Sequence, residues 1–194
     1  MEILSAAVML FLIMDPLGNL PVILSILKHL DPKRRRVVLI RELSFALVVL
    51  LLFLFAGKSI LNFLHIEAET LRISGGLILF IIAIRMIFPQ PGGVVGLAAG
   101  EEPFFVPMAV PMIAGPSVIA SLLLLSSHSP DRMLDWSLAL LLAWGATFLV
   151  LMFYSFFHRV LGEKGLKAIE RLMGLLLVMM STQMFLDGMK QYLG

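Results

Sequence analysis

A polar stretch, Asp15-Pro16-Leu17-Gly18-Asn19-Leu20-Pro21, interrupts an otherwise apolar run from Ile3 to Leu27. In an unbroken helix Asp15 would lie about 18 Å into this run, roughly the middle of a hydrocarbon core about 30 Å thick. A carboxylate is costly at that depth, and proline and glycine disfavour a continuous helix. Broken backbone at membrane depth is tolerated only where protein or a water-filled cavity satisfies it. The stretch therefore predicts the unwound centre of a discontinuous transmembrane helix.

Asp15 has two compatible roles in such a break. As an N-cap it would accept hydrogen bonds from the amides of the second half-helix, with Pro16 at the first helical position. Its carboxylate could also bind a coupling cation or the ammonium group of a substrate. We expect Asn19 to cap or to bind substrate, and Gly18 to permit close approach of backbone or ligand.

A second interruption, Pro111-Met112-Ile113-Ala114-Gly115-Pro116-Ser117, lies in the other half of the chain. Gly115 can end one half-helix and Pro116 can begin the next. The exposed amides and the positive dipole end at that point suit a carboxylate, and Ser117 could add a hydroxyl donor. The alternative is a proline kink that only shapes helix contacts. Two such interruptions favour a site over two kinks.

The composition indicates that transmembrane helices position these residues. Of 194 residues, 60% are hydrophobic and 14% charged, against about 25% charged in soluble proteins. We predict one all-α transmembrane domain, residues 1–194, with a Pro/Gly-rich connection at Pro89–Pro103. Its six spans are Ile3–Leu27, Val38–Leu64, Thr70–Phe88, Phe104–Ser127, Leu134–Val160 and Leu166–Met189, of which the first and fourth are broken.

Basic residues predict the orientation of these spans. Lysine and arginine mark cytoplasmic loops, and 11 of the 15 fall on one side, including the loop Lys33–Arg36. The other side carries Lys58, Arg72, Arg132 and Lys190. Both termini should then face the periplasm.

The two halves of the chain share weak internal similarity. Pro16 and Pro21 are five positions apart, as are Pro111 and Pro116. Arg72-Ile73-Ser74-Gly75 and Arg171-Leu172-Met173-Gly174 open the third and sixth spans. We therefore predict two three-helix repeats, residues 1–95 and 103–194. Because three is odd, the second repeat would be inverted, and paired interrupted helices in inverted halves are typical of a transporter's substrate site.

Other polar side chains have weaker indications. Ser181, Thr182 and Gln183 lie inside the sixth span and either line the pathway or bond across helices. We expect Arg41 and Glu42 at the membrane interface, snorkelling or paired with neighbours.

Arg85 and three glycines lie in the third and sixth predicted spans. Arg85 is read as an interfacial anchor, with an ion pair to Glu101 or Glu102 as the alternative. Glycines 75, 76 and 174 are expected where helices pack closely.

Several function classes are excluded. The chain has no cysteine, which argues against iron–sulfur, zinc-thiolate and thiol-redox roles. The histidines stand at span ends and not at metal-ligand spacing, and an intramembrane serine protease would need a partner for Ser117 within the membrane. We expect no enzyme activity, no metal, no cofactor and no nucleic-acid partner.

Met14-Asp15-Pro16-Leu17-Gly18-Asn19-Leu20-Pro21, together with Val110-Pro111 and Ala114-Gly115-Pro116, resembles the MarC family of bacterial and archaeal inner-membrane proteins over essentially the whole chain. That family is also described as the neutral amino acid transporter family. The resemblance implies transport of small neutral amino acids such as glycine and alanine. Asp15, Gly18, Asn19, Pro21, Gly115 and Pro116 match its motif positions, whereas Ser117 stands where the family often has glycine.

The sequence therefore predicts an inner-membrane secondary transporter with its site between the two broken helices. Its partners would be a small-molecule substrate and the lipid bilayer, with H⁺ or Na⁺ as a possible coupling ion, and the oligomeric state is left open. One alternative is a channel or facilitator for a small polar solute. Another is a regulatory membrane protein that transports nothing.

Overall fold

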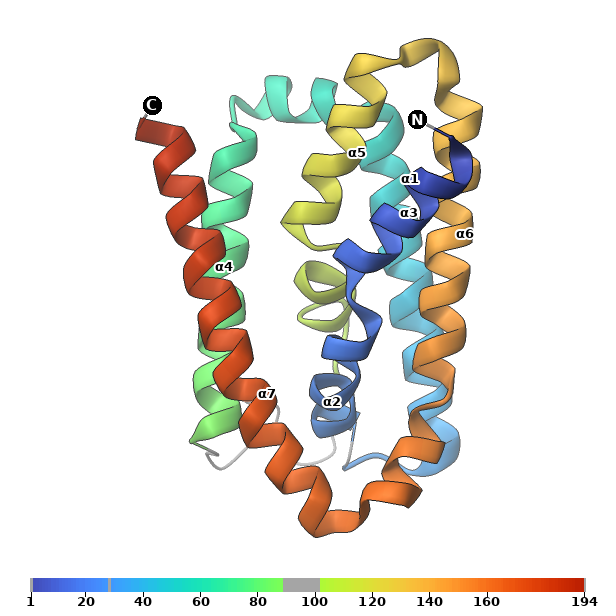
Figure 1. Cartoon of the computed structure of the whole chain (residues 1–194), viewed down its shortest axis with the longest axis vertical. Coiled ribbons are helices and arrows are strands. Elements are labelled where there is room, and N and C mark those ends of the chain that lie inside the picture. The colour runs from blue at the N-terminus through green and yellow to red at the C-terminus, as the bar shows by residue number, and fades with distance from the viewer. Residues whose placement is uncertain (1, 28, 89–101, 194) are drawn as a thin grey trace.

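The computed structural model describes residues 2–27, 29–88 and 102–193, which form helices and no β-strand (Figure 1). Five stretches among these residues are long and apolar enough to cross a membrane: Ile3–Leu27, Pro32–Leu64, Glu69–Ile87, Pro130–Met152 and Arg171–Leu193. The helix Pro116–Ser127 is apolar but shorter. Glu101 and most of the predicted connection Pro89–Pro103 lie outside the described residues.

The first apolar run is broken as predicted, but over a shorter length. Helix α1, Ile3–Met14, ends at Asp15, and helix α2, Pro16–Leu27, begins at once. Asp15 alone adopts the left-handed conformation, with φ 42° and ψ 60°. Pro21 lies inside α2, not in unwound chain. The reason is that Pro16 at the first helical position has no amide to satisfy, so α2 can start immediately after its cap.

The second break joins two short helices. The segment η1, Met108–Ile113, is followed by Ala114, Gly115 and helix α5, Pro116–His128. In η1 the amide of Met112 donates to the Pro107 carbonyl at 3.2 Å and that of Ala114 to the Ala109 carbonyl at 2.8 Å. These i→i−5 bonds widen the turn, because Pro107 and Pro111 have no N–H to donate.

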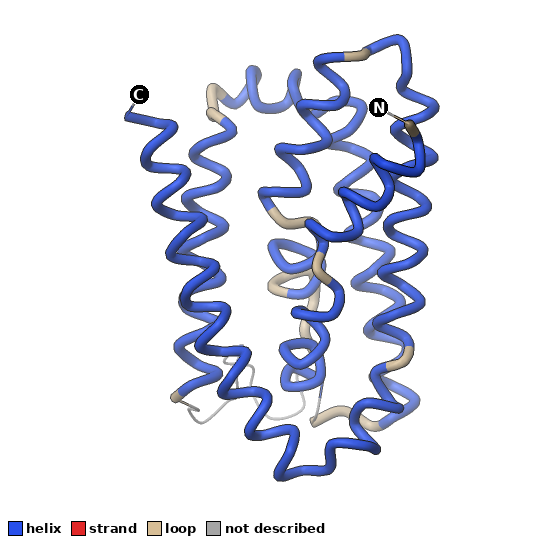
Figure 2. The backbone as a smooth tube through the Cα atoms, viewed as in Figure 1, coloured by secondary structure: helices blue, strands red, loops and turns tan. Residues whose placement is uncertain are grey.

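The remaining helices form two pairs around the broken ones. They are α3, Pro32–Leu64; α4, Ala68–Ile87; α6, Met133–Met152; and α7, Tyr154–Leu193, with the short turn η2, Pro130–Arg132, before α6. Helices α4 and α7 run side by side, and α3 contacts α6 (Figure 1). The segments α1, α2, η1 and α5 lie between these pairs, and both breaks lie near mid-height of the molecule (Figure 2).

The ends of the fifth and sixth predicted spans differ from the structure. Helix α6 ends at Met152, whereas the sequence predicted a span to Val160. Helix α7 begins at Tyr154, before the predicted start of the sixth span at Leu166, and contains the apolar stretch Arg171–Leu193. The apolar run continues through Phe153 to Phe157, so hydropathy does not mark the turn at Phe153.

Glycines 75, 76 and 174 lie where helices pack closely, as predicted, and two of them bring α4 and α7 together. A Cβ added at Gly76 would lie 3.0 Å from the Ser181 carbonyl oxygen, and one at Gly174 would lie 3.3 Å from the Ala83 carbonyl oxygen. Gly75 serves a different contact: a Cβ there would overlap the ring of Pro116 at the start of α5. These positions hold α4 against both α7 and the second break.

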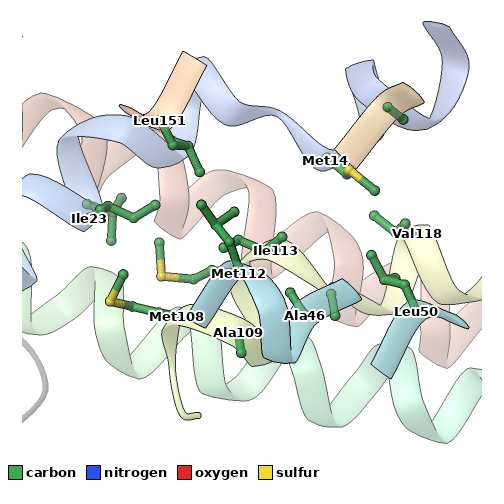
Figure 3. Packing of buried hydrophobic residues seen from close by; sticks show 14 of the residues in the cluster. Met14, Ile23, Ala46, Leu50, Met108, Ala109, Met112, Ile113, Val118 and Leu151 are labelled. Atoms are coloured by element: carbon green, nitrogen blue, oxygen red, sulfur yellow. The ribbon is translucent and has the colours of Figure 1, made fainter. Parts of the chain in front are cut away.

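The core surrounds η1. Figure 3 shows Met108, Met112 and Ile113 among side chains from α2, α3 and α6, including Ile23, Ala46, Leu50 and Leu151. These residues are buried and belong to one apolar cluster. The segment η1 is thus held by side-chain contacts on several faces, which compensates for its irregular backbone.

Both termini lie at one end of the molecule, and the start of α3 lies at the other (Figure 1). The arrangement agrees with an even number of crossings. Lys33–Arg36 belongs to the first turns of α3 and not, as the sequence had predicted, to a loop, because Pro32 can begin a helix. We call the second end, with the start of α3 and residues 102–107, the basic end.

Candidate functional site

Asp15 joins the two halves of the first span. Its carboxylate Oδ1 accepts a hydrogen bond from the Gly18 amide at 3.0 Å, and its carbonyl accepts from the Asn19 amide at 3.0 Å. These are the bonds of an N-cap, so the capping role expected for Asp15 is present. The second role, contact with a cation or substrate, requires that the carboxylate also face open space.

Gly18 is needed for the position of that carboxylate. A Cβ built at residue 18 would overlap Oδ2 of Asp15 and lie 2.8 Å from its Cγ. The capping carboxylate therefore folds back over residue 18 in the space that a side chain would occupy. Any larger residue would have to displace it.

Asn19 ties the two breaks together. Its side-chain amide donates to the Met14 carbonyl at 2.8 Å and to the Met112 carbonyl at 3.2 Å. Met14 ends α1 and Met112 lies near the end of η1, where carbonyls lack intrahelical donors. One side chain thus satisfies backbone groups at both breaks, 93 residues apart in sequence.

The start of α5 presents unused donors. Gly115 has extended backbone, with φ −77° and ψ 158°, and its carbonyl accepts from Ile119 at 3.0 Å. Pro116 has no N–H, and among the described residues no acceptor is found for the amides of Ser117 and Val118. Such amides and the positive end of the helix dipole attract anions.

One cavity of about 450 Å³ connects these features. Of the seven residues predicted for the site, six line it: Asp15, Gly18, Asn19, Gly115, Pro116 and Ser117. Pro21 does not line it, because it lies further along α2. The volume is within the range of about 300–1,000 Å³ usual for small-molecule sites.

Three polar side chains on α4 and α7 complete the wall. Arg72 lines the cavity and donates to Oε1 of Gln191 at 2.8 Å. Gln183 also lines it and donates to Oδ1 of Asp187, a third lining residue, at 2.8 Å. For Gln183 the sequence left open whether it lines the pathway or bonds across helices, and the structure places it in the cavity wall. Arg72 and Asp187 were not predicted to line the cavity, because residues near span ends are usually interfacial.

The two polar neighbours of Gln183 have other positions. Ser181 is buried and donates to the Val178 carbonyl at 3.0 Å, and Thr182 is exposed, so neither lines the cavity.

The rest of the wall is rich in methionine. Five methionines line the cavity: Met14, Met112, Met173, Met180 and Met184. The hydroxyl of Ser117 lies 3.9 Å from the Met184 sulfur. Unbranched thioether side chains adapt to different shapes, so this wall suits a small ligand with an apolar part.

A separate charged cluster lies at the basic end. Arg34 pairs with Glu102 through two hydrogen bonds, one of them 2.9 Å from Nη2 to Oε2. Arg41 contacts Glu42 at 3.0 Å and Glu102 at 3.4 Å, and donates to the Pro103 carbonyl. The hydrogen bond from Arg34 lowers the pKa of Glu102 below its ordinary value. The alternative ion pair of Arg85 with Glu102 is therefore wrong.

Glu42 is paired with its neighbour Arg41, which is one of the alternatives that the sequence offered, but its complete burial was not predicted. It is 0% exposed, and its charge is matched by Arg41 on the same helix. The core face of α3 accounts for this position, because Leu39, Leu43 and Ala46 are also buried.

Comparison with known proteins now adds to this geometry. A family profile described as "MarC family integral membrane protein" matches residues 1–193. The chain belongs to the MarC family. The resemblance based on the Asp15–Pro21 motif and the second break is confirmed, and no solved structure matches the chain.

Relatives of this MarC-family protein span its full length. The UPF0056 inner membrane protein YhgN of Escherichia coli strain K12 is 61% identical over 193 residues, covering 99% of this chain and 98% of the relative. A UPF0056 membrane protein of Buchnera aphidicola subsp. Baizongia pistaciae is 53% identical, covering 98% of each. One from Chlamydia pneumoniae is 35% identical, covering 96% and 93%. These names support a membrane location and state no substrate.

Proposed function

We propose that this MarC-family protein is a secondary transporter of small neutral amino acids. The observation that carries the proposal is a single cavity lined by both helix breaks, with a carboxylate on one break and unused amides on the other. A zwitterion needs a partner for each of its charges. The start of α5 at Ser117 and Val118 would hold the carboxylate, and Asp15 would hold the ammonium group.

The energy source would be an ion gradient or exchange. The sequence has no P-loop for ATP. The flexible methionine wall leaves space for a small side chain beside the two charged groups.

We further propose that residues 1–95 and 103–194 are inverted copies. The order of elements supports this: a broken pair, α1–α2 or η1–α5, precedes two long helices in each half. The contacts of α3 with α6 and of α4 with α7 pair the corresponding helices. Rocking of one half against the other would then expose the cavity alternately to the two sides.

Uptake into proteoliposomes tests the function. We expect saturable uptake of radiolabelled glycine and alanine, dependent on an imposed proton or sodium gradient and inhibited by excess unlabelled alanine. Lysine and glutamate should compete poorly, because their side chains are longer and place a second charge among the methionine side chains. Preloaded alanine should accelerate entry by counterflow.

Two outcomes would contradict this function. Flux that rises linearly with concentration and shows no counterflow would indicate a channel or facilitator. Flux equal to that of empty liposomes, from protein that unfolds cooperatively on heating, would leave a role without transport of these substrates.

Orientation gives a further prediction. Since 11 of 15 basic residues fall on the side of the basic end, we expect this end in the cytoplasm and both termini in the periplasm. The cysteine-free chain allows single-cysteine labelling with a membrane-impermeant maleimide. Tyr192→Cys should react in cells whose outer membrane alone is permeabilised, and Lys33→Cys only after the inner membrane is opened. The reverse pattern would overturn the topology.

A further inference from the structure

Glu42 is a buried carboxylate with unused hydrogen-bonding capacity. Its side chain is 0% exposed, and Oε1 accepts from Nε of Arg41 at 3.0 Å. Oε2 has no hydrogen-bond partner. An ionised carboxylate is expensive to bury unless both oxygens are satisfied, and a buried polar atom without a partner calls for an explanation.

The position of Glu42 connects it to the cavity wall. Its carboxyl group lies against the backbone at Phe105 and Ala109, where the chain enters η1. Helix α3 packs on η1, and Pro111 and Met112 of η1 line the cavity. A change at Glu42 can therefore reach the cavity through one short segment.

Arg41 holds that segment from several sides. Its guanidinium contacts Glu42 and Glu102, donates to the Pro103 carbonyl and lies 5.1 Å from the centre of the Phe104 ring. Glu102 is held in addition by Arg34. Arg41 thus has other partners if its pair with Glu42 weakens.

The charges that face Glu42 are few. On its own helix the facing charge is Arg41, and from the preceding segment Glu102 reaches it through Arg41. The elements packed on α3 are η1, α5 and α6. Residues 108–113 and 116–127 carry no charged side chain. Asp135, in the first turn of α6, is paired with Arg132 at 2.7 Å. The described surroundings of Glu42 therefore offer Oε2 no cation besides Arg41.

We propose that Oε2 of Glu42 is a proton-binding site that controls the attachment of η1 to α3. A proton from water would bind Oε2 and neutralise the carboxylate. Arg41 would keep Glu102 and the Pro103 carbonyl, so the segment before Phe105 would stay on α3. The neutral carboxyl group would attract the backbone at Phe105 and Ala109 more weakly, so the entry to η1 would loosen and the cavity wall at Pro111 and Met112 could move. The ligand is a proton, so the proposal does not depend on which substrate is carried.

Infrared difference spectroscopy tests proton binding directly. Spectra are compared between about pH 5 and about pH 9, a range that includes measured pKa values of buried glutamates in other proteins. In the wild-type protein we expect a difference band from a carboxyl group that is protonated at the lower pH. Glu42→Gln should abolish the band and Glu42→Asp should shift it, whereas Glu102→Gln should leave it. Absence of any pH-dependent carboxyl band from the wild-type protein, or its persistence in Glu42→Gln, would overturn the proposal. The first outcome requires no variant to fold.

A second measurement tests the coupling to η1. The labelling rate of Met112→Cys by a small thiol reagent is compared between the Glu42 and Glu42→Gln backgrounds at each pH, which cancels the titration of the thiol. At alkaline pH the Gln background should label about tenfold faster, because the charged carboxylate that holds the backbone at Phe105 and Ala109 is lost. The rates should converge at acidic pH. A constant ratio would mean a fixed structural ion pair. No amino acid is present, so the result is separate from the transport test.

Discussion

Replacing Asp15 by asparagine is expected to leave the protein folded but to lower its saturable uptake at least about tenfold. This loss corresponds to about 1.4 kcal/mol of binding free energy. Asparagine keeps an oxygen that can accept from Gly18 and nearly the same volume, so α2 should still be capped. The substitution removes only the charge that would hold an ammonium group or a coupling cation. Asp15→Ala should lose uptake and, in addition, about 1 kcal/mol of stability with the cap.

The chain provides a matched control for this variant. Asp31 also precedes a proline at the start of a helix, α3, but it is exposed and does not line the cavity. Asp31→Asn at equal expression should transport normally. Wild-type uptake and gradient dependence in Asp15→Asn would reduce Asp15 to a structural cap, and the binding role would pass to the start of α5.

Asn19→Asp should cause the largest loss of stability. The wild-type amide donates to the Met14 and Met112 carbonyls, whereas an aspartate would place an acceptor against both. A buried polar group left without its partner costs about 1–3 kcal/mol, and here two carbonyls lose theirs. We expect thermal unfolding in detergent at a clearly lower temperature, with a free-energy loss of about 2 kcal/mol or more.

Asn62 gives the comparison for this substitution. It is exposed near the end of α3, so Asn62→Asp introduces the same charge without touching a break. Its unfolding temperature should be close to that of the wild type. Equal unfolding temperatures for Asn19→Asp and Asn62→Asp would show that the link between the two breaks contributes little to stability.

The sequence indicated the membrane class, the positions of the breaks and six of the residues that line the cavity. A carboxylate with prolines in an apolar run has few structural solutions, because a membrane supplies no water to satisfy broken backbone. Asp15 and Gly115–Ser117 could therefore be assigned from the residues alone. The assignment of Pro21 to the site did not agree with the cavity, because a proline can also lie inside a helix, away from the break.

Other features depend on tertiary contacts that a linear pattern does not contain. The bond from Asn19 to Met112 joins residues 93 apart. Arg72 and Asp187 reach the cavity only because α4 and α7 pack along their length. The burial of Glu42 was not predicted, since its position near the end of a span does not reveal that this face of α3 is covered by η1.

Substrate protection of a cysteine in the cavity tests the central claim most directly. Met180 lines the cavity and is 54% exposed, whereas its neighbour Met179 is 60% exposed and does not line it. With detergent-solubilised Met180→Cys, alanine should slow maleimide labelling in a saturable manner, and glutamate should not; labelling of Met179→Cys should be unaffected by either. Unchanged labelling of Met180→Cys at alanine concentrations that saturate uptake would place the substrate elsewhere and contradict this account.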